Sequence, residues 1–322
     1  MVTAINHHDI NAQVRLERTP QPVTASGQQT SVVGNGELSV PGRVEVACPS
    51  GSAGRRRVCP VFVGTCGYSY TEWVDSGFYP EGTRTTEMLG LYSRCFSVVE
   101  LNYTWYQMAR ADALTRMVEK APAHLLFAAK LTRTMTHERD DNWREQLQLY
   151  RQGIAPLGSR LVAVLIQLPP EFDRSIAHRN YLGALLDDLA DLPVAVEFRH
   201  RSWAQDSVFV ELERRRVALV TVDEPSLPTL FPPLDVVTNP AQFYVRFHGR
   251  NREGWRAGNM QKKFNYDYSD EELSDWCSRY LSSMASRADK GFMFFNNHVR
   301  AQAPRNGSRL ASILARQGCG KG

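Results

Sequence analysis

Apolar and polar positions follow a regular order along the chain from residue 58 onward. Short runs of consecutive apolar residues are separated by longer stretches whose apolar residues recur every three or four positions. The short runs are typical of strands buried on both faces, and the longer stretches are typical of amphipathic helices. The pattern predicts eight strands, at residues 58–66, 97–104, 125–130, 161–168, 194–199, 217–223, 242–248 and 291–297.

Helical spacing fills most of the intervals between these strands. The connection at residues 224–240 carries five prolines and predicts a loop. Eight buried strands that alternate with helices predict an α/β fold, a single (β/α)8 TIM-type barrel with an eight-stranded parallel sheet. An open doubly wound sheet is the alternative, but residues 64–67 (GTCG) after the first strand lack the GxGxxG turn of that fold. The predicted helices are residues 85–96, 112–120, 142–154, 176–190, 206–216, 269–288 and 308–317.

Residues 1–57 show no sustained helical or alternating pattern. They are rich in Gly, Ser, Thr, Gln and Pro, and they end in three arginines at positions 55–57. Such a segment cannot bury enough apolar surface to offset its ordering entropy. The predicted organisation is a disordered N-terminal extension (1–57), a barrel (58–317) and a tail (318–322). The three arginines fit either a solvated linker end or an arm for nucleic acid or a protein partner.

Composition narrows the class of protein further. The 322 residues are 43% hydrophobic and 22% charged, and the net charge of +4 gives no global argument for nucleic-acid binding. The six cysteines form no CxxC pair, so neither a zinc ribbon nor a disulfide framework is indicated. The absence of a long apolar run and of a secretory signal predicts a cytoplasmic protein without a membrane partner. The oligomeric state is left open.

Polar residues gather where the predicted strands end. In three strands they form pairs two positions apart, which places both members on one face, while Leu101, Phe198 and Phe247 between them face the helices. The C-terminal ends of parallel barrel strands meet at one mouth, where active sites of TIM-type barrels lie. A functional site is therefore predicted at this mouth. The polar residues at the strand ends are Glu100 and Asn102, Lys130, Gln167, Glu197 and Arg199, Asp223, Arg246 and His248, and Asn296 with Asn297.

One interpretation of this mouth is acid–base or metal chemistry. The candidate catalytic residues are Glu100, Glu197, Asp223 and His248, of which His248 is the one whose unperturbed pKa lies near neutrality. The same four residues are the candidate ligands of a divalent metal. Arginines on the same faces would repel a cation and pair with the acids. No cofactor motif is evident, so the cofactor stays unknown, with a divalent metal possible.

A second interpretation is an anion receptor. Lys130, Arg199 and Arg246 are placed to receive a phosphate or carboxylate, and the loop of residues 249–268 adds further Arg and Lys. Aromatic residues near the rim can stack on sugars or bases, which keeps nucleic acid open as a partner. His137, after the third strand, is a loop residue that can reach the mouth. The remaining ligand-binding candidates are Asn102, Gln167, Asn296, Asn297, Tyr70, Trp203 and Trp255.

Several sequence blocks in one order resemble a known family. They are GTCGYSYTEW followed by FYP, then VELNYTWY, FAAKLTRTMTH, LIQLPPEF, VEFRHRSW, YVRFHGRN, NYDYSDEELSDW and FFNNHVRAQAPRNG. From about residue 58 to 308 the chain resembles the YecE-like family, also called domain of unknown function 72. The resemblance implies a TIM-type barrel without an established reaction and a distant relationship to sugar isomerases. Cys66, Tyr68, Tyr103 and Ala301 depart from the family pattern.

Three functions follow from these observations. The first is an enzyme, a hydrolase or isomerase, acting on a small polar anionic ligand that is phosphorylated or sugar-like. The second is a metal-dependent enzyme, either sugar isomerase-like or acting on nucleic-acid phosphodiesters, and basic loops converging on one mouth would favour the nucleic-acid form. The third is a non-catalytic ligand-binding barrel, in which the acids would be fully paired with Arg199 and Arg246.

Overall fold

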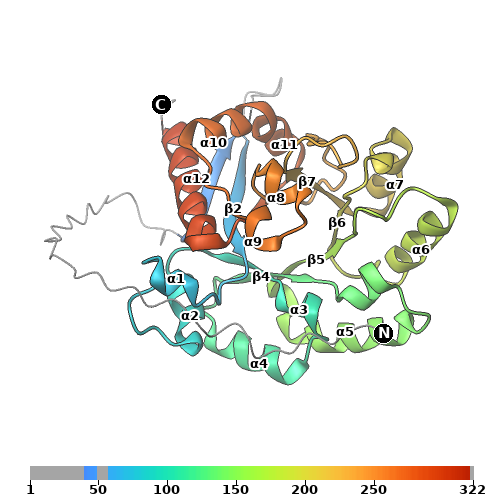
Figure 1. The fold of residues 1–322 in the computed structure, drawn as a ribbon, viewed down its shortest axis with the longest axis horizontal. Coiled ribbons are helices and arrows are strands. Elements are labelled where there is room, and N and C mark those ends of the chain that lie inside the picture. Colours follow the sequence, from blue (N-terminus) through green and yellow to red (C-terminus); the bar gives the residue numbers. More distant parts are fainter. Residues whose placement is uncertain (1–39, 49–56, 320–322) are drawn as a thin grey trace, which may run out of the picture. The chain divides into compact units, whose positions relative to one another are not determined.

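Eight parallel strands close into a barrel in the computed structural model, which describes residues 40–48 and 57–319, with side chains as far as residue 316 (Figure 1). Each strand pairs with the next in the chain, and pairing between the first and the last closes the ring. The predicted fold is confirmed. The barrel strands are β2 (Val58–Cys66), β3 (Val98–Leu101), β4 (Leu126–Lys130), β5 (Leu161–Gln167), β6 (Val194–Glu197), β7 (Ala218–Asp223), β8 (Phe243–Phe247) and β9 (Gly291–Phe295).

Helices surround the barrel and follow the predicted segments closely. The predicted helix at 269–288 consists of α10 and α11 joined through a π-helical turn, Cys277–Leu281. The last helix begins at Gln302 instead of residue 308, because Pro304 falls in its first turn, where proline is tolerated. The main helices are α2 (Thr85–Tyr92), α4 (Ala111–Lys120), α5 (Trp143–Ile154), α6 (Ile176–Asp187), α7 (Asp206–Arg215), α10 (Asp270–Trp276), α11 (Ser282–Arg287) and α12 (Gln302–Cys319).

Short helices lie in the connections that follow the strands. The segment between β7 and β8 contains no helix, as its prolines predict. The Thr134–Glu138 turn after β4 is π-helical, and 3-10 turns occur at Ala155–Arg160, Arg201–Trp203 and Val299–Ala301. All of these connections except Ala155–Arg160, which leads from α5 into the start of β5, frame the C-terminal ends of the barrel strands. The short α-helices are α1 (Glu72–Asp75), α3 (Tyr103–Tyr106), α8 (Arg252–Arg256) and α9 (Met260–Lys263).

A further strand, β1 (Arg43–Ala47), lies within the segment predicted to be disordered. It pairs antiparallel with β2, from Arg43 opposite Phe62 to Ala47 opposite Val58. Cys48 extends the contact, because its thiol donates to the carbonyl of Ala285 at 3.1 Å. The prediction of disorder is therefore wrong for these residues, whose alternating stretch is too short to stand out in the sequence. Residues 1–39 and 49–56 of the predicted extension lie outside the described residues.

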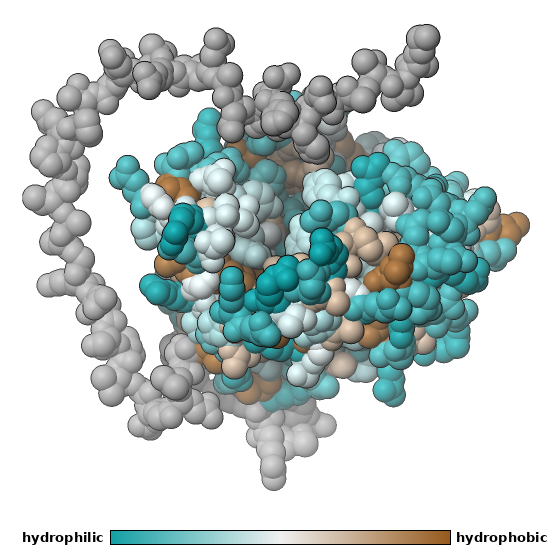
Figure 2. All heavy atoms as spheres, turned by 90° about the horizontal axis from the view of Figure 1, so that it is seen from below, coloured by the Kyte–Doolittle hydropathy of each residue, from teal (hydrophilic) through white to brown (hydrophobic). Residues whose placement is uncertain are grey.

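The core fills both the barrel and the layer between strands and helices. Phe247 packs against Trp276 of α10 and Phe198 stacks on Trp203, so these strand residues face the helices as predicted. Large exposed hydrophobic residues are scattered over different elements, and the face drawn in Figure 2 is mostly hydrophilic. No helix in the described part of the chain is long and apolar enough to cross a membrane.

Candidate functional site

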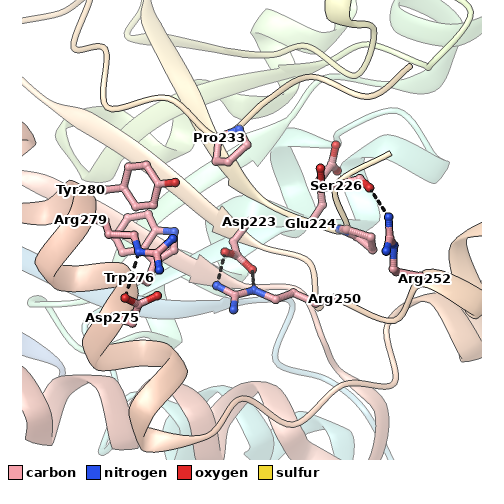
Figure 3. A pocket seen from close by; sticks show the side chains of 11 residues that line it. Asp223, Glu224, Ser226, Pro233, Arg250, Arg252, Asp275, Trp276, Arg279 and Tyr280 are labelled. Carbon is pink, nitrogen blue, oxygen red and sulfur yellow. Dashed lines mark hydrogen bonds and ion pairs between the residues drawn. The ribbon is translucent and has the colours of Figure 1, made fainter. Parts of the chain in front are cut away.

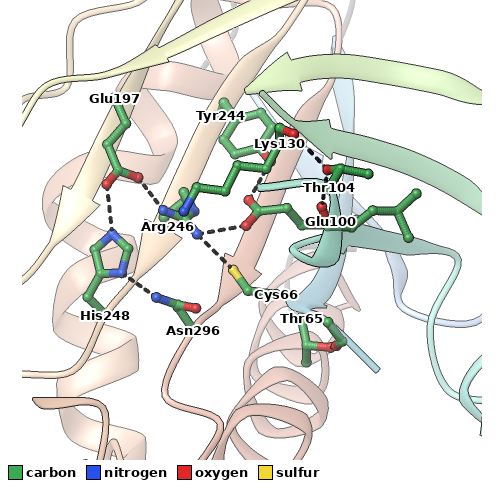
Figure 4. A network of polar contacts seen from close by, with 12 residues as sticks. Thr65, Cys66, Glu100, Thr104, Lys130, Glu197, Tyr244, Arg246, His248 and Asn296 are labelled. Atoms are coloured by element: carbon green, nitrogen blue, oxygen red, sulfur yellow. Dashed lines mark hydrogen bonds and ion pairs between the residues drawn. The ribbon is translucent and has the colours of Figure 1, made fainter. Parts of the chain in front are cut away.

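Arg246, on β8, lies at the centre of a buried ionic network (Figure 4). Its guanidinium forms ion pairs with Glu100 at 2.7 Å and with Glu197 at 2.6 Å, and all three side chains are at most 1% exposed. The hydroxyl of Tyr244 donates to Glu100 at 2.8 Å, and Arg246 also donates to the sulfur of Cys66 at 3.4 Å. Burial alone would lower the pKa of Arg246, but the two carboxylates outweigh it and raise this pKa, which keeps the guanidinium charged.

Arg199, just after β6, extends the network toward β7. It forms ion pairs with Glu197 and with Glu224, each at 2.5 Å. Burial tends to raise the pKa of Glu197, but Arg199 and Arg246 outweigh it and hold that pKa well below its usual value. Burial raises the pKa of Glu224 to about 7, and the single partner Arg199 offsets this only in part. Glu197 is thus a permanent anion, whereas Glu224 titrates near neutrality.

His248 is enclosed by the same network. Arg199 donates to its Nε2 at 2.9 Å, and the side-chain amide of Asn296 lies 3.0 Å from its Nδ1. Burial, followed by the charge of Arg199, lowers the pKa of His248 well below its usual value. The imidazole is therefore neutral at neutral pH, and the expectation that His248 titrates there does not hold. Glu224, directly after β7, is the acid of this network whose pKa of about 7 lies in that range.

The register of β7 separates Asp223 from the other acids. Val222 pairs with Arg246 and Asp223 pairs with Phe247, and paired residues of neighbouring strands point to the same side of a sheet. Asp223 therefore turns toward the helices with Phe247, and the next residue, Glu224, turns to the network. The structure does not bring Asp223 together with Glu100, Glu197 and His248, as the sequence analysis expected.

Asp223 instead lines a second cavity, of about 640 Å³, outside the ring of strands (Figure 3). Arg250 pairs with it at 2.7 Å, and Arg279 pairs with Asp275 at 2.9 Å in the same cavity. Arg252 donates to the backbone carbonyl of Ser226. Two of the three arginines in this second cavity are thus already neutralised by acids that share its wall.

The mouth of the barrel holds a cavity of about 470 Å³, which we call the mouth cavity. Four of its residues are cationic, and among the described residues no Asp or Glu lines it. Glu100 and Glu197 lie beneath it, fully buried and paired with the arginines. Its lining residues are Tyr70, Asn102, Trp105, Tyr106, Lys130, His137, Gln167, Pro170, Arg199, Arg246, Met260, Gln261, Lys263, Phe264, Asn296 and His298.

Two titratable groups of this wall come from β4 and the turn after it. Lys130 is 8% exposed and its Nζ lies 4.8 Å from the centroid of the Trp105 ring. Burial, followed by the charge of Arg246, lowers the pKa of Lys130 to about 7. Burial and then Lys130 lower the pKa of His137 to about 4, so this imidazole is neutral at neutral pH.

Most of the other predicted ligand-binding residues reach the mouth cavity. Asn102, Gln167, Asn296 and Tyr70 all line it. The ring of Tyr70 stacks on His298 with 5.0 Å between centroids. These residues give the cavity amide groups and an aromatic wall beside its cations.

Three predicted residues lie elsewhere. Trp203 is buried in the helix layer, where its Nε1 donates to the carbonyl of Phe172. Asn297 faces away from the cavity and donates to the carbonyl of Tyr266 and to Asn306. Trp255 is not part of the cavity wall, but Arg199 lies over its ring at 5.2 Å. Position next to a strand end therefore does not by itself place a side chain in the mouth.

The basic loop after β8 contributes little charge to the mouth cavity. Only Lys263 of its cationic residues lines the cavity, with its Nζ 3.7 Å from the Trp255 centroid. Burial, followed by the charge of Arg199, lowers the pKa of Lys263 to about 8. Arg250 and Arg252 belong to the second cavity, and Arg256 and Lys262 are exposed. Basic loops thus do not converge on the mouth.

The four candidate metal ligands do not form a common site. His248 approaches Glu197 at 3.4 Å, but Glu100 is joined to Glu197 only through Arg246, and Asp223 faces the helices. Within residues 40–48 and 57–319, no group of three or more His, Cys, Asp or Glu side chains is placed to hold a metal ion. The acids of the network are instead partners of arginines.

Sequence reasoning missed Glu224, Tyr106 and the short helix α3, whereas Trp105 was among the aromatic residues expected near the rim. Strand alternation carries a signal for Glu224: it lies two positions after Val222, which pairs with the inward-facing Arg246. Trp105 and Tyr106 belong to a helix that begins directly after β3, so they lie over the mouth. No periodicity in four residues could predict this helix.

Comparison with known proteins agrees with this architecture. A UPF0759 protein, YunF, from Bacillus subtilis (strain 168) is 29% identical over 266 residues, which cover 76% of this chain and 93% of that protein. A solved DUF72 family structure from Thermotoga maritima MSB8 is 32% identical with a TM-score of 0.72, covering 79% of this chain and 98% of that one. Another, from Enterococcus faecalis V583, is 25% identical with a TM-score of 0.70, covering 79% and 95%.

The family model described as "Protein of unknown function DUF72" matches residues 62–321. This range includes all barrel strands except the start of β2, and it contains every residue that lines the mouth cavity. The predicted resemblance is thereby confirmed under the DUF72 name. The chain belongs to the DUF72 family, a family of TIM-type barrel proteins of unknown function.

Proposed function

We propose that the mouth cavity binds a small anionic molecule. The observation that carries this proposal is the separation of charges. The cations Lys130, Arg199, Arg246 and Lys263 line the cavity. The acids that pair with the two arginines do not line it: Glu100 and Glu197 are buried beneath it, and Glu224 is held by Arg199. Apart from Pro170 and Met260, the described residues that a ligand meets in the cavity are cationic, amide or aromatic, and none of them is a carboxylate. Charge-assisted hydrogen bonds from such groups favour phosphates and carboxylates.

The buried acids position the arginines for this role. A guanidinium held by two carboxylates from different strands cannot turn away from the cavity without breaking a buried ion pair. Glu100 and Glu197 hold Arg246 in this way, and Glu197 with Glu224 holds Arg199. Fixed donors bind an anion with less loss of side-chain entropy than mobile surface lysines do. We therefore infer that these acids are positioning residues and not the acid–base groups of a reaction.

The aromatic side of the cavity suits the uncharged part of such a ligand. Tyr70, Trp105 and Tyr106 line it, and Tyr106 is 65% exposed at the rim. Asn102, beside Tyr70, adds an amide that can hydrogen-bond to hydroxyl groups. A phosphorylated or sugar-like molecule has both features, an anionic group and a ring with hydroxyls. A cavity of about 470 Å³ is within the range of small-molecule sites.

One observation favours a second candidate, a non-catalytic binding barrel. Glu100, Glu197 and Glu224 all pair with Arg199 or Arg246, which is close to the full pairing expected of such a protein, although Asp223 pairs with Arg250 instead. If the mouth cavity does catalyse a reaction, its titratable groups include Lys130 and His137, which line it, and not the buried Glu100 or Glu197. An enzyme acting on the anionic ligand remains our first proposal because these two groups face the cavity.

Thermal shift measurements test anion binding directly. The probes are inorganic phosphate, glucose 6-phosphate and AMP, each compared with an uncharged counterpart, glucose or adenosine. A ligand at about 100 times its Kd stabilises the folded state by about 2.7 kcal/mol, which gives a measurable rise in Tm. We expect at least one phosphorylated probe to raise the Tm and its uncharged counterpart to leave it unchanged.

Variants locate the binding site. Lys263→Met removes a cation of the mouth cavity, and Arg279→Met is the matched control because Arg279 lines the second cavity. We expect the stabilisation to weaken in Lys263→Met and to persist in Arg279→Met. Equal stabilisation of all three proteins, or none by any anionic probe, would contradict the proposal.

A further inference from the structure

Lys130 occupies an unusual position for a lysine. Its side chain projects from the end of β4 into the mouth cavity and is 8% exposed. In the described part of the chain, no Asp or Glu oxygen lies within 4.0 Å of its Nζ, whereas Arg246 and Arg199 each have two carboxylate partners. The amine is therefore enclosed, unpaired and directed at the space that a ligand would occupy.

The surroundings of Lys130 favour the neutral amine over the ammonium ion. Burial and the charges of Arg246 and Arg199 act in that direction, and together they outweigh Glu100 and Glu197 to lower the pKa of Lys130 to about 7. The face of the Trp105 ring at 4.8 Å acts in the opposite direction, because it favours a cation. A substantial fraction of the side chain is thus an unprotonated nucleophile near pH 7.

The other residues of the cavity suit a carbonyl compound with an anionic group. Arg199 and Lys263 provide cations for the anionic group. Gln167 and Asn296 provide amides for the oxygen of the carbonyl group. His137 provides an imidazole that is neutral at neutral pH, because burial and then Lys130 lower its pKa to about 4. Each of these groups lines the same cavity as the amine.

We propose that Lys130 forms a Schiff base with a carbonyl compound that carries a carboxylate or phosphate. This inference rests on the anion binding proposed above and names the substrate class of that site. The reacting group is then the amine of Lys130, and not one of the acids of the buried ionic network. Enclosure without a carboxylate partner, next to cations, is the arrangement that activates a lysine for this chemistry.

The reaction needs no further reactant except one proton, which water supplies. The lone pair of Nζ attacks the carbonyl carbon, a C–N bond forms, and the π electrons of the carbonyl move to oxygen, which takes up a proton. The nitrogen loses a proton, and the carbinolamine then expels its hydroxyl group as water when that group is protonated. The products are the protonated imine on Lys130 and one molecule of water.

Reductive trapping tests the proposal. The full-length protein is incubated with pyruvate or dihydroxyacetone phosphate in the presence of sodium cyanoborohydride, and the adduct is located by intact mass and peptide mapping. Methyl pyruvate is the matched control because it has the same reactive carbonyl and no negative charge. We expect one adduct, at Lys130, and about tenfold more of it with the anionic probe than with methyl pyruvate, because anchoring raises the local concentration of the carbonyl.

The variant Lys130→Arg keeps the positive charge over Trp105 but cannot form an imine. We expect it to lose the adduct and to keep a Tm close to that of the wild type. Arg279→Met, in the second cavity, keeps Lys130 and the whole mouth cavity and should still be labelled. Excess sulfate should suppress labelling of the wild type, and this result does not depend on the folding of any variant.

The outcomes separate this inference from the proposed function. Labelling spread over surface lysines, or equal in the wild type and Lys130→Arg, overturns the assignment of Lys130. Stabilisation by an anionic probe without any adduct also overturns it, but leaves anion binding intact. Equal labelling of Lys130 by pyruvate and methyl pyruvate contradicts the anionic substrate class, whereas the proposed function is contradicted if no anionic probe raises the Tm of the wild type.

Discussion

Replacement of Arg246 is the most informative perturbation of the buried network. Arg246→Met keeps a side chain of similar length, so it removes the charge with little loss of packing. Glu100 and Glu197, both 0% exposed, then each lose an ion pair of 2.7 or 2.6 Å. Breaking a buried ion pair by removing one partner costs about 3–5 kcal/mol, because the remaining charge is left uncompensated in a medium of low dielectric constant.

Arg250 provides a matched control. It forms an ion pair of the same length, 2.7 Å, with Asp223, but its side chain is 31% exposed. Asp223 is 7% exposed, but it lines the second cavity, where water can reach it, and it keeps the hydrogen bond from Tyr268, so after Arg250→Met we expect a loss of only about 1 kcal/mol. The double variant Arg246→Met/Glu100→Gln removes one of the orphaned charges and should recover about 1–2 kcal/mol relative to Arg246→Met, as coupled neighbours do.

Urea unfolding at pH 7, followed by tryptophan fluorescence, measures these differences as changes in the free energy of unfolding. The account requires Arg246→Met to be clearly more destabilising than Arg250→Met. If both single variants lowered the free energy of unfolding by the same small amount, burial would not strengthen the ion pairs of the network. The role of its acids in holding the arginines would then be refuted.

Three further predictions follow. The pKa of Glu224 is raised from 4.5 to about 7, so its ionisation costs the folded state about 3 kcal/mol, a penalty that is absent below pH 4.5 and complete above pH 7. In urea unfolding, the free energy of unfolding of Glu224→Gln relative to wild type should therefore be higher at pH 8 than at pH 5. A difference between the two proteins that does not depend on pH would contradict this. Sulfate affinity measured by calorimetry should fall from pH 6 to pH 9, because Lys130 (pKa about 7) and Lys263 (pKa about 8) lose their protons while sulfate keeps its charge. A constant affinity would exclude these amines from the site. A chain that begins at Val58 lacks β1 and should have a lower Tm than one that begins at Val40, whereas equal values would show that β1 adds no stability.

The barrel could be predicted from the sequence because its signal is local. Eight apolar runs and their intervening helices are each long enough to be recognised, and the number of strands implies closure. Pairs such as Glu197 with Arg199 share a face by alternation alone, so their convergence was also predictable. The five residues of β1 were missed because a short strand at the edge of a sheet depends on its partner for stability.

The parts of the site that escaped prediction depend on long-range contacts. Asp223 and Glu224 are adjacent acids, and the choice between them is made by the register of β7 against β8. His248 has an ordinary sequence context, and its pKa is lowered by burial and by Arg199, a residue 49 positions away. Trp203 follows a strand end but packs into the helix layer, because the chain turns outward there. Such features appear only when the strands are placed beside one another.

A crystal structure of the protein soaked in selenate, with the anion located by its anomalous signal, tests the central claim most directly. The account predicts a selenate in the mouth cavity, within hydrogen-bond distance of Arg199 and of Lys130 or Lys263. A selenate bound only in the second cavity, beside Arg250 and its neighbours, or no bound selenate at all, would contradict it.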